Sequence, residues 1–190
     1  ALNNKKLNPP IKHLFVWNSD IANCTPDSRN VRDGLKRKDL FTVVHDTFWT
    51  DSCMYADVVL PADTQLEHTD LHAPYGHYYF SLSQQAIKPL GESKSNQDLF
   101  RDLAKKMGYK EKCFRESDES MIKNMIDPKH NPLFKGVTYK RLKKNGWVKG
   151  DVNNPRRNYL KTGWPTKDKK IQIYSEDTKN IGLGAYPSYT

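Results

Sequence analysis

Residues 40–61 constrain the fold more than any other part of the sequence. They contain two short apolar runs, residues 41–46 and 57–61, with a polar stretch between them. Val-rich runs of this length, bounded by turn residues, are typical of strands that are buried on both faces of a parallel sheet. Ligands of such sheets bind at the carboxyl ends of the strands. We therefore expect a ligand where the two runs end, at His45, Asp46 and Pro61.

Neighbouring segments complete an α/β pattern. Residues 11–17 predict an earlier strand, and a short helix over residues 50–56 connects the second strand to the third. Between the first two strands, Thr25 is expected to be the N-cap of a helix, with Pro26 at its first position. This alternation predicts an α/β fold, a doubly wound, mainly parallel sheet with flanking helices, which is Rossmann-like.

The helix over residues 96–107 carries the clearest local signals. Ser95 or Asn96 caps its start, and Gly108 follows its last turn as the C′ residue. Its apolar face is expected to pack on the sheet through Leu99, Phe100 and Leu103. The strand residues expected to be buried are Phe15, Val43, Val44, Val58, Val59 and Leu60.

The sequence predicts three parts. They are a linker over residues 1–10, the α/β domain over residues 11–115, and an irregular, basic, helical and loop extension over residues 116–190 that leads toward a C-terminal domain absent from the sequence. Further elements are expected as strands over residues 78–82 and 170–175 and as helices over residues 117–126 and 138–146. The apolar content of 36% is low, so we expect faces meant for neighbours, seen as exposed aromatic side chains around residues 75–80.

Charge and cysteine content restrict the function. The formal net charge is +9, which favours an anionic partner such as a phosphate, a nucleic acid or an acidic surface. Three widely spaced cysteines without a CxxC pair argue against a disulfide framework and a local zinc or iron–sulfur motif, and favour the reducing cytoplasm. No signal peptide and no apolar run of about 20 residues occur, so direct membrane insertion is not expected. Because the sequence begins with Ala1, we expect it to be processed or cut from a longer protein.

Two strand ends carry candidate ligand-binding side chains. Asp46 can accept two parallel hydrogen bonds from a guanine edge or a ribose diol, or it can cap the next turn or pair with a nearby Lys. Asn18 and Ser19 can bind phosphate or sugar oxygens beside a helix N-terminus, or they can form an Asx turn. The nicotinamide fingerprint GxGxxG does not occur.

Two other groups of residues offer weaker sites. The histidines and the carboxylate of the first are Glu67, His68, His72 and His77. Zinc hydrolases often use HExxH on one helix, whereas here the order is EHTDLH and Pro74 follows, which argues against zinc. The loop over residues 91–96 combines flexibility, a cation and a helix N-terminus, which can hold an anion or can be a plain capped loop.

Several segments, in this order, carry a family resemblance: NSDIANCTPDSRNVRDGLKRKDLF, VVHDTFWTDSCMYADVVLP, LEHTD, AIKPLGESKSNQDLFRDLAKKMG and, more thinly, KIQIYSE with LGAYPSY. Together they resemble the molybdopterin oxidoreductase family, the bis-molybdopterin guanine dinucleotide enzymes related to dimethyl sulfoxide reductase, formate dehydrogenase and nitrate reductase. The resemblance covers mainly residues 11–108.

The resemblance implies that residues 11–115 bind one of two molybdopterin guanine dinucleotides that chelate molybdenum or tungsten. By position, the cofactor-binding residues it implies are Asn18, Ser19, His45, Asp46, His68 and Asn96. Asp46 falls at the guanosine, while His68 stands where relatives often have Lys and Asn96 where they often have Asp. It implies no catalytic residue and no metal ligand in this chain.

The resemblance also implies partners. They are the remaining domains of the same subunit, which supply the metal ligand and any iron–sulfur cluster, and an electron-transfer subunit. The intact subunit is then an oxidoreductase, and this chain alone is expected to be inactive. Two other classes stay open. A basic α/β module binding nucleic acid would explain the charge, although its basic residues lie in loops and helix ends rather than between aromatic ones. The second open class is a small metal hydrolase, and the histidine spacing argues against it.

Overall fold

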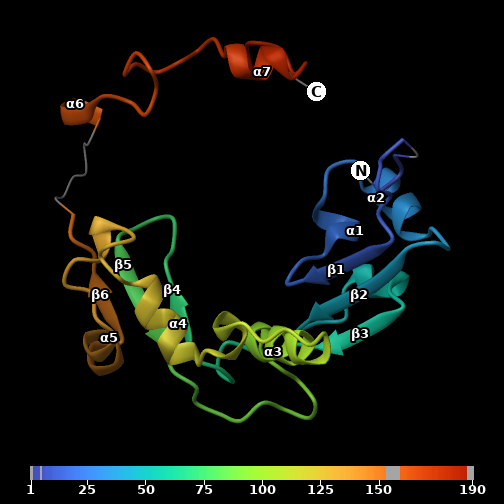
Figure 1. The fold of residues 1–190 in the computed structure, drawn as a ribbon, viewed down its shortest axis with the longest axis horizontal. Coiled ribbons are helices and arrows are strands. Elements are labelled where there is room, and N and C mark those ends of the chain that lie inside the picture. The colour runs from blue at the N-terminus through green and yellow to red at the C-terminus, as the bar shows by residue number, and fades with distance from the viewer. Residues whose placement is uncertain (1, 5, 153–158, 188–190) are drawn as a thin grey trace. The chain divides into compact units, whose positions relative to one another are not determined.

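The structure is a computed structural model that describes residues 2–4, 6–152 and 159–187. Its contacts divide the chain into two compact units, Ala1–Asp151 and Val152–Thr190. The described part of the first unit contains two three-stranded sheets, one parallel and one antiparallel (Figure 1). The units are considered separately below.

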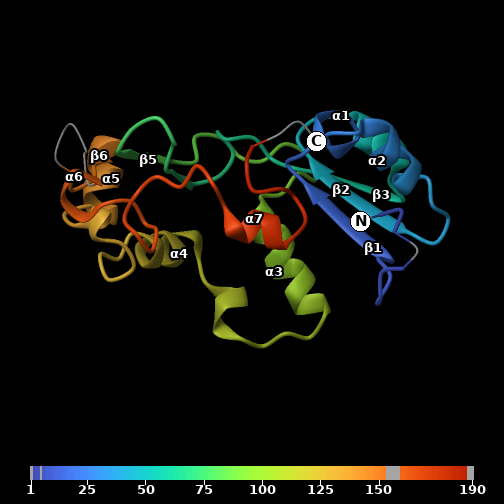
Figure 2. The same ribbon diagram turned by 90° about the horizontal axis from the view of Figure 1, so that it is seen from above.

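The first sheet is parallel, and its strand order follows the sequence. Its strands are β1 (His13–Trp17), β2 (Phe41–Asp46) and β3 (Val58–Pro61). In the register, Phe15 lies beside Val43, and Val43 beside Val58. The three carboxyl ends therefore lie along one edge of the sheet, as the arrows of Figure 2 show. The predicted α/β class is confirmed.

Helices pack on both faces of this sheet. They are α1 (Ile21–Cys24) and α2 (Ser28–Leu35) before β2, the 3₁₀ helix η1 (Asp51–Tyr55) before β3, and α3 (Asn96–Lys106). Leu14 of β1 points to the core that α1 and α2 form with Ala22 and Leu35. The alternate residue Phe15 lies against Phe100 of α3, with ring centroids 5.5 Å apart. Because side chains alternate across a strand, β1 contributes to a core on each face, and both faces of the sheet are covered by helices.

Burial in the sheet is less complete than the apolar runs predict. Val44 is fully buried, whereas Phe15, Val43, Val59 and Leu60 are half-buried. Val58 is 38% exposed, so its predicted burial is wrong, because β3 pairs only with β2 and forms an edge among the described residues. Leu103, which was expected to pack on the sheet with Leu99 and Phe100, is 39% exposed. Its helix also contacts the 3₁₀ helix η2 (Lys112–Arg115).

Local capping signals succeed for α3 and fail for α2. Ser95 Oγ accepts a hydrogen bond from the Asp98 amide at 3.1 Å, and Gly108 has a φ of +81°, as predicted. The predicted N-cap Thr25 is wrong, because Asp27 caps α2 by accepting from the Asn30 amide. Thr25 instead ends α1 in an extended conformation, which the following Pro26 favours.

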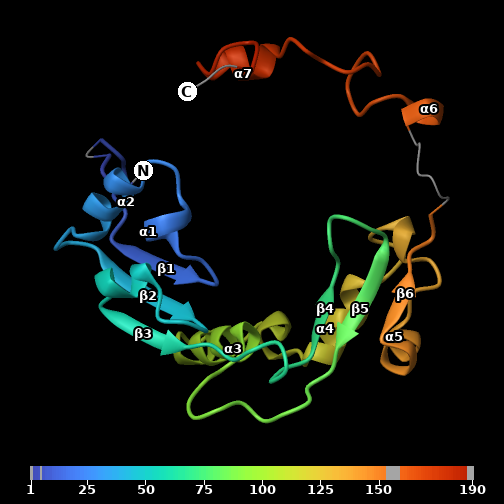
Figure 3. The same cartoon turned by 180° about the vertical axis from the view of Figure 1, so that it is seen from behind.

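The second sheet is antiparallel, with β4 (Asp70–His72), β5 (Tyr79–Ser83) and β6 (Trp147–Lys149) side by side (Figure 3). The helices α4 (Asp118–Met125) and α5 (Tyr139–Asn145), and the 3₁₀ helix η3 (Pro132–Phe134), accompany it. Its core is formed mainly by Phe80, Leu82, Ile122, Leu142 and Val148. The helices α4 and α5 and the strand β5 lie where they were predicted, whereas η3, β4 and β6 were not predicted. Of the expected exposed aromatics, Tyr75 is fully exposed but Phe80 is buried.

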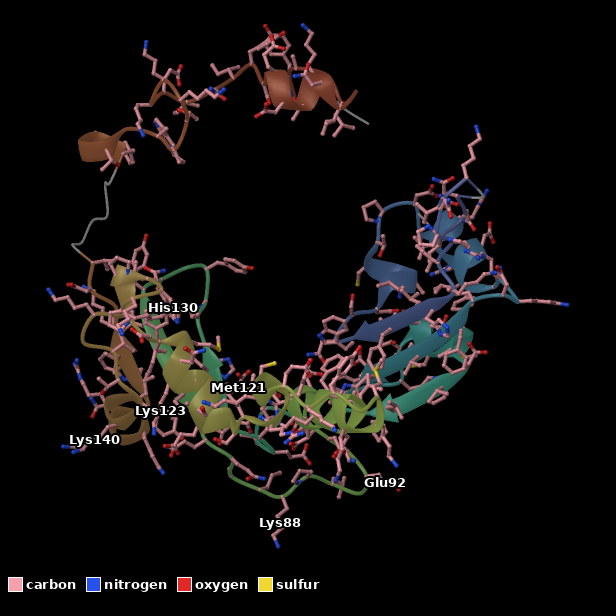
Figure 4. All side chains as sticks on the ribbon, viewed as in Figure 1. Lys88, Glu92, Met121, Lys123, His130 and Lys140 are labelled. Atoms are coloured by element: carbon pink, nitrogen blue, oxygen red, sulfur yellow. The ribbon has the colours of Figure 1, made fainter. Side chains whose placement is uncertain are left out.

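Contacts cross the expected domain boundary at residue 115. Arg101 of α3 donates to Asp118 at the start of α4, and its guanidinium also lies 3.5 Å from the sulfur of Met121, which Figure 4 labels. Tyr79 of β5 pairs with Lys149 of β6. The predicted end of the cofactor-binding domain at residue 115 stays a prediction, because these contacts do not show which residues bind the cofactor.

The second unit contains two short helices in its described part, α6 (Tyr159–Thr162) and α7 (Glu176–Asn180). No strand forms over residues 170–175 in this described segment, so that prediction is wrong. Ile171 and Ile173 alternate with polar residues but are 64% and 76% exposed, and alternation without a partner strand does not make a sheet. Residues 1 and 5 of the expected linker and residues 153–158 and 188–190 of the expected extension lie outside the described residues. None of the described helices has the length and apolar character needed to cross a membrane.

Candidate functional site

An open pocket of about 510 Å³ lies at the carboxyl edge of the parallel sheet. Its volume falls in the range of about 300–1,000 Å³ that is common for ligand sites. Three of the predicted site residues line it, namely Asn18, His68 and Asn96. The structure adds Asp63 and Asp70 to the lining, together with His72 from the weaker histidine group. The other predicted residues, Ser19, His45 and Asp46, are not among the residues that line it.

The loop after β1 is held in place by a buried polar cluster. Asn18 has a φ of +49°, a backbone conformation that Asn tolerates better than most residues. Its backbone N–H donates to the His45 carbonyl at 3.2 Å. Asp20 accepts from the Ser52 hydroxyl at 2.6 Å and from the Ser52 amide at 3.0 Å. Burial acts to raise the pKa of Asp20, but these hydrogen bonds outweigh it, and the pKa is lowered. Asn18 and Ser19, both exposed, thus lie in a loop that these hydrogen bonds attach to its neighbours.

His45 connects the sheet to the start of α3. Its side chain is fully buried at the end of β2, and its Nδ1 lies 3.1 Å from the Asn96 amide oxygen. An amide oxygen only accepts hydrogen bonds, so Nδ1 carries the proton and Nε2 is the acceptor. Nε2 is buried without a partner among the described residues. His45 therefore acts on the pocket through Asn96.

Asp46 is half-buried and makes a local hydrogen bond. Its Oδ1 accepts from the Phe48 amide at 3.2 Å, which is the turn-capping arrangement considered for it. Its Oδ2 takes no hydrogen bond from any described residue. The structure thus supports a turn-capping contact for one carboxylate oxygen and leaves the ligand role of Asp46 a prediction.

A carboxylate–imidazole pair forms one wall of the pocket. Asp63 is buried, and its Oδ1 lies 2.9 Å from Nδ1 of His68. Burial raises the pKa of Asp63, the charge of His68 opposes this, and the nearby carboxylates of Glu67 and Asp98 add to the rise. Sequence reasoning missed Asp63, because nothing local distinguishes it from a surface aspartate.

Glu67 organises the loops around this pair. Its carboxylate accepts from the amides of Thr64 at 2.6 Å and Leu90 at 2.7 Å. The bond from Thr64 is the main cause that lowers the pKa of Glu67, so the carboxylate is ionised. The spacing of Thr64 and Glu67, three residues apart as in a capping box, is a signal that could have revealed this role.

The remaining candidates have other contacts. Lys94, in the loop over residues 91–96, forms an ion pair of 2.6 Å with Asp102, and its backbone bridges to Ala62 at the sheet edge. These contacts correspond to a plain capped loop, which was the alternative to an anion-binding loop. His77 Nδ1 accepts from the Tyr79 amide at 3.2 Å. In the part of the chain that the structure describes, no three His, Cys, Asp or Glu residues are grouped as a metal site would require.

Comparison with known proteins identifies the family. The model of the molybdopterin oxidoreductase family matches residues 1–106, which is more than half of the chain. The chain belongs to the molybdopterin oxidoreductase family. All residues that line the pocket fall within this match.

Individual molybdopterin oxidoreductase relatives extend this result. The chain is 41% identical to the probable oxidoreductase YoaE of Bacillus subtilis over 182 residues, which are 96% of the chain and 26% of that protein. It is 36% identical to the F420-dependent formate dehydrogenase subunit alpha of Methanocaldococcus jannaschii over 146 residues, 76% of the chain and 21% of that protein. The chain thus spans about a quarter of the length of these relatives.

A solved structure shows the same fold. Acetylene hydratase from Pelobacter acetylenicus superimposes with a TM-score of 0.69 over 95% of this chain and 24% of that one. The sequence identity is 24%, so the similarity concerns the fold.

Proposed function

We propose that this chain forms part of the cofactor site of a molybdenum or tungsten oxidoreductase and binds one molybdopterin guanine dinucleotide. The observation that carries the proposal is the pocket of about 510 Å³ at the carboxyl edge of the parallel sheet, within the residues that match the family. The guanosine end lies beside Asp46, and Asn18, Ser19, His68 and Asn96 contact the rest of the ligand. His45 positions Asn96.

The chemistry of the pocket fits such a group. Its diphosphate needs hydrogen-bond donors, and the eleven-residue helix α3 begins at the pocket with Asn96 and Gln97, where free amides and the helix dipole favour anions. Of the two carboxylate oxygens of Asp46, Oδ1 accepts from the Phe48 amide, so Oδ2 can accept from a guanine edge. The bound cofactor supplies the redox-active metal, while these residues hold and orient it.

We propose further that the chain alone holds the cofactor poorly and is inactive. It spans about a quarter of the length of its relatives, and a ligand site usually buries about 70–90% of its ligand. Other domains of the same subunit then complete the site, and an electron-transfer subunit receives or supplies electrons. Metal and pterin analysis of the purified 190-residue chain is the test, and a stoichiometric cofactor would contradict this proposal.

The substitution Asp46→Asn in the full-length enzyme tests the guanosine contact. The amide oxygen of Asn keeps the turn-capping bond to Phe48, whereas the charge that guanine would contact is lost. A hydrogen bond to a charged group contributes about 1.5–3 kcal/mol, so the metal and guanine content per protein should fall sharply while the circular dichroism spectrum stays unchanged.

Asp33→Asn is the matched control, because Asp33 is an exposed residue of α2 that pairs only weakly with Lys36, at 3.5 Å. It should retain the full metal and guanine content. If Asp46→Asn also retains both, Asp46 is a turn-capping residue only and the proposed guanosine contact is wrong.

A further inference from the structure

The second sheet has two chemically different faces. On one face, Leu71, Phe80, Leu82 and Val148 pack into the core with α4 and α5. The alternate residues point the other way and form what we call the outer face: Asp70, His72, Tyr79, Ser81, Trp147 and Lys149. The outer face thus combines aromatic rings, an imidazole and a hydroxyl, all side chains that can contact a ligand.

The register places these side chains in a continuous row. His72 pairs with Ser81, and Ser81 pairs with Trp147. Neighbouring strands are about 4.8 Å apart, so Trp147 lies about 10 Å from His72 on the same face. Trp147 is 55% exposed, and its ring contacts that of Tyr79 with centroids 5.3 Å apart. This contact supports the indole on one side and leaves much of its surface open.

The outer face continues the pocket described above. Asp70 and His72 belong to both, because they line the pocket and lie on the outer face, and His72 starts the row that ends at Trp147. A ligand that leaves the strand ends past His68 therefore meets His72 next. An elongated ligand can follow the row across the sheet without leaving the surface of this unit.

We propose that the outer face is the second wall of the ligand site and that Trp147 stacks on the pterin ring of the bound cofactor. This rests on the proposed function. A guanine dinucleotide cofactor carries a ring system at each end, and placing the guanosine at Asp46 directs the other ring along the pocket. Aromatic side chains stack on planar heterocycles of many kinds, and His72 and Ser81 supply hydrogen bonds to the polar edge of the ring.

Oxidative footprinting of the full-length enzyme tests the position of the ring. Hydroxyl-radical modification of Trp147 is compared by peptide mass spectrometry between enzyme from normal cells and enzyme from cells unable to make the cofactor. We expect modification of Trp147 to fall several-fold when the cofactor is present. Met125, 56% exposed on the helix that packs on the opposite face, is the internal control and should be modified equally in both samples.

Variants then separate stacking from coverage by another domain. Trp147→Ala should lose its pterin, measured as the fluorescent oxidised product after gel filtration, roughly 10-fold faster than the wild type, since a stacking contact is lost. Trp147→Phe keeps a ring and should retain most of the pterin, and Met125→Ala should behave as the wild type.

Each outcome has one interpretation. Equal modification of Trp147 in both samples overturns the inference. Protection of Trp147 without faster pterin loss in Trp147→Ala also overturns it, because a protein segment then covers the outer face. An enzyme purified from normal cells without any pterin overturns the proposed function itself, whereas a pterin-containing enzyme that fails the Trp147 tests leaves that function intact.

Discussion

The substitution Ser52→Ala is expected to destabilise the fold by removing the link between two strand-end loops. Ser52 is 1% exposed, and its hydroxyl donates to Asp20 at 2.6 Å while accepting from the buried Ala22 amide at 3.1 Å. A hydrogen bond to a charged group contributes about 1.5–3 kcal/mol, and an unsatisfied buried amide costs about 1–3 kcal/mol. The two effects share one atom and do not simply add, so we expect a loss of about 3 kcal/mol.

The pH dependence gives this prediction a second signature. Hydrogen bonds from Ser52 hold the pKa of Asp20 below its ordinary value of 3.8, against the effect of burial. This contribution is present above pH 3.8 and is lost as the pH falls through the lowered pKa of Asp20. The difference in stability between wild type and Ser52→Ala should therefore be constant from about pH 5 to 7 and shrink below pH 4.

Urea unfolding followed by circular dichroism between pH 3 and 7 measures both quantities. Ser83→Ala is the matched control, because the Ser83 hydroxyl makes one exposed hydrogen bond, to the Gln65 carbonyl at 3.0 Å. It should cost no more than about 1 kcal/mol. A loss below about 0.5 kcal/mol for Ser52→Ala, or a difference that grows toward low pH, would refute the assigned role of the cluster.

Two further predictions concern stability. Leu142→Ala, at a side chain with 0% exposure in the core of the second sheet, should lower the free energy of unfolding by about 2–5 kcal/mol in urea titrations, while Leu90→Ala, at 84% exposure, should change it by less than about 0.5 kcal/mol. An equal effect of the two would mean that the second sheet lacks the described core. Burial raises the pKa of Asp63 above 3.8 despite the charge of His68. The free energy of unfolding of the wild type should therefore fall relative to that of Asp63→Asn as the pH rises through the raised pKa. At lower pH the two free energies should converge. Urea titrations from pH 3 to 7 in which the wild type instead gains relative stability would contradict this sign.

Much of the candidate site could be predicted, because strand ends are local features. Residues 41–46 read as a strand and form one, and the parallel order follows from the strand–helix–strand alternation. Asn18 and Asn96, two of the residues that the resemblance names, line one pocket. The carboxylate Asp63 could not be predicted, since its significance comes from burial beside His68 and not from any spacing in the sequence.

Local patterns by themselves determined the elements whose signals lie within a few residues. The caps Ser95 and Gly108 bound α3, and Thr138 and Gly146 bound α5, because caps satisfy the backbone groups of the adjacent turn. The Val-rich apolar run over residues 41–46 likewise placed β2 without knowledge of its neighbours.

Only the tertiary structure decided what depends on distant partners. The three-residue strands β4 and β6 are too short to be recognised alone and exist because β5 pairs with both, Tyr79 meeting Lys149 from 70 positions later in the chain. The same dependence explains the opposite failure at residues 170–175, where alternation is present but no strand pairs with it in the described residues. A strand is stabilised by hydrogen bonds to its neighbours. The sequence of a short segment therefore shows only that the segment can form a strand, and the rest of the chain determines whether a partner strand is present.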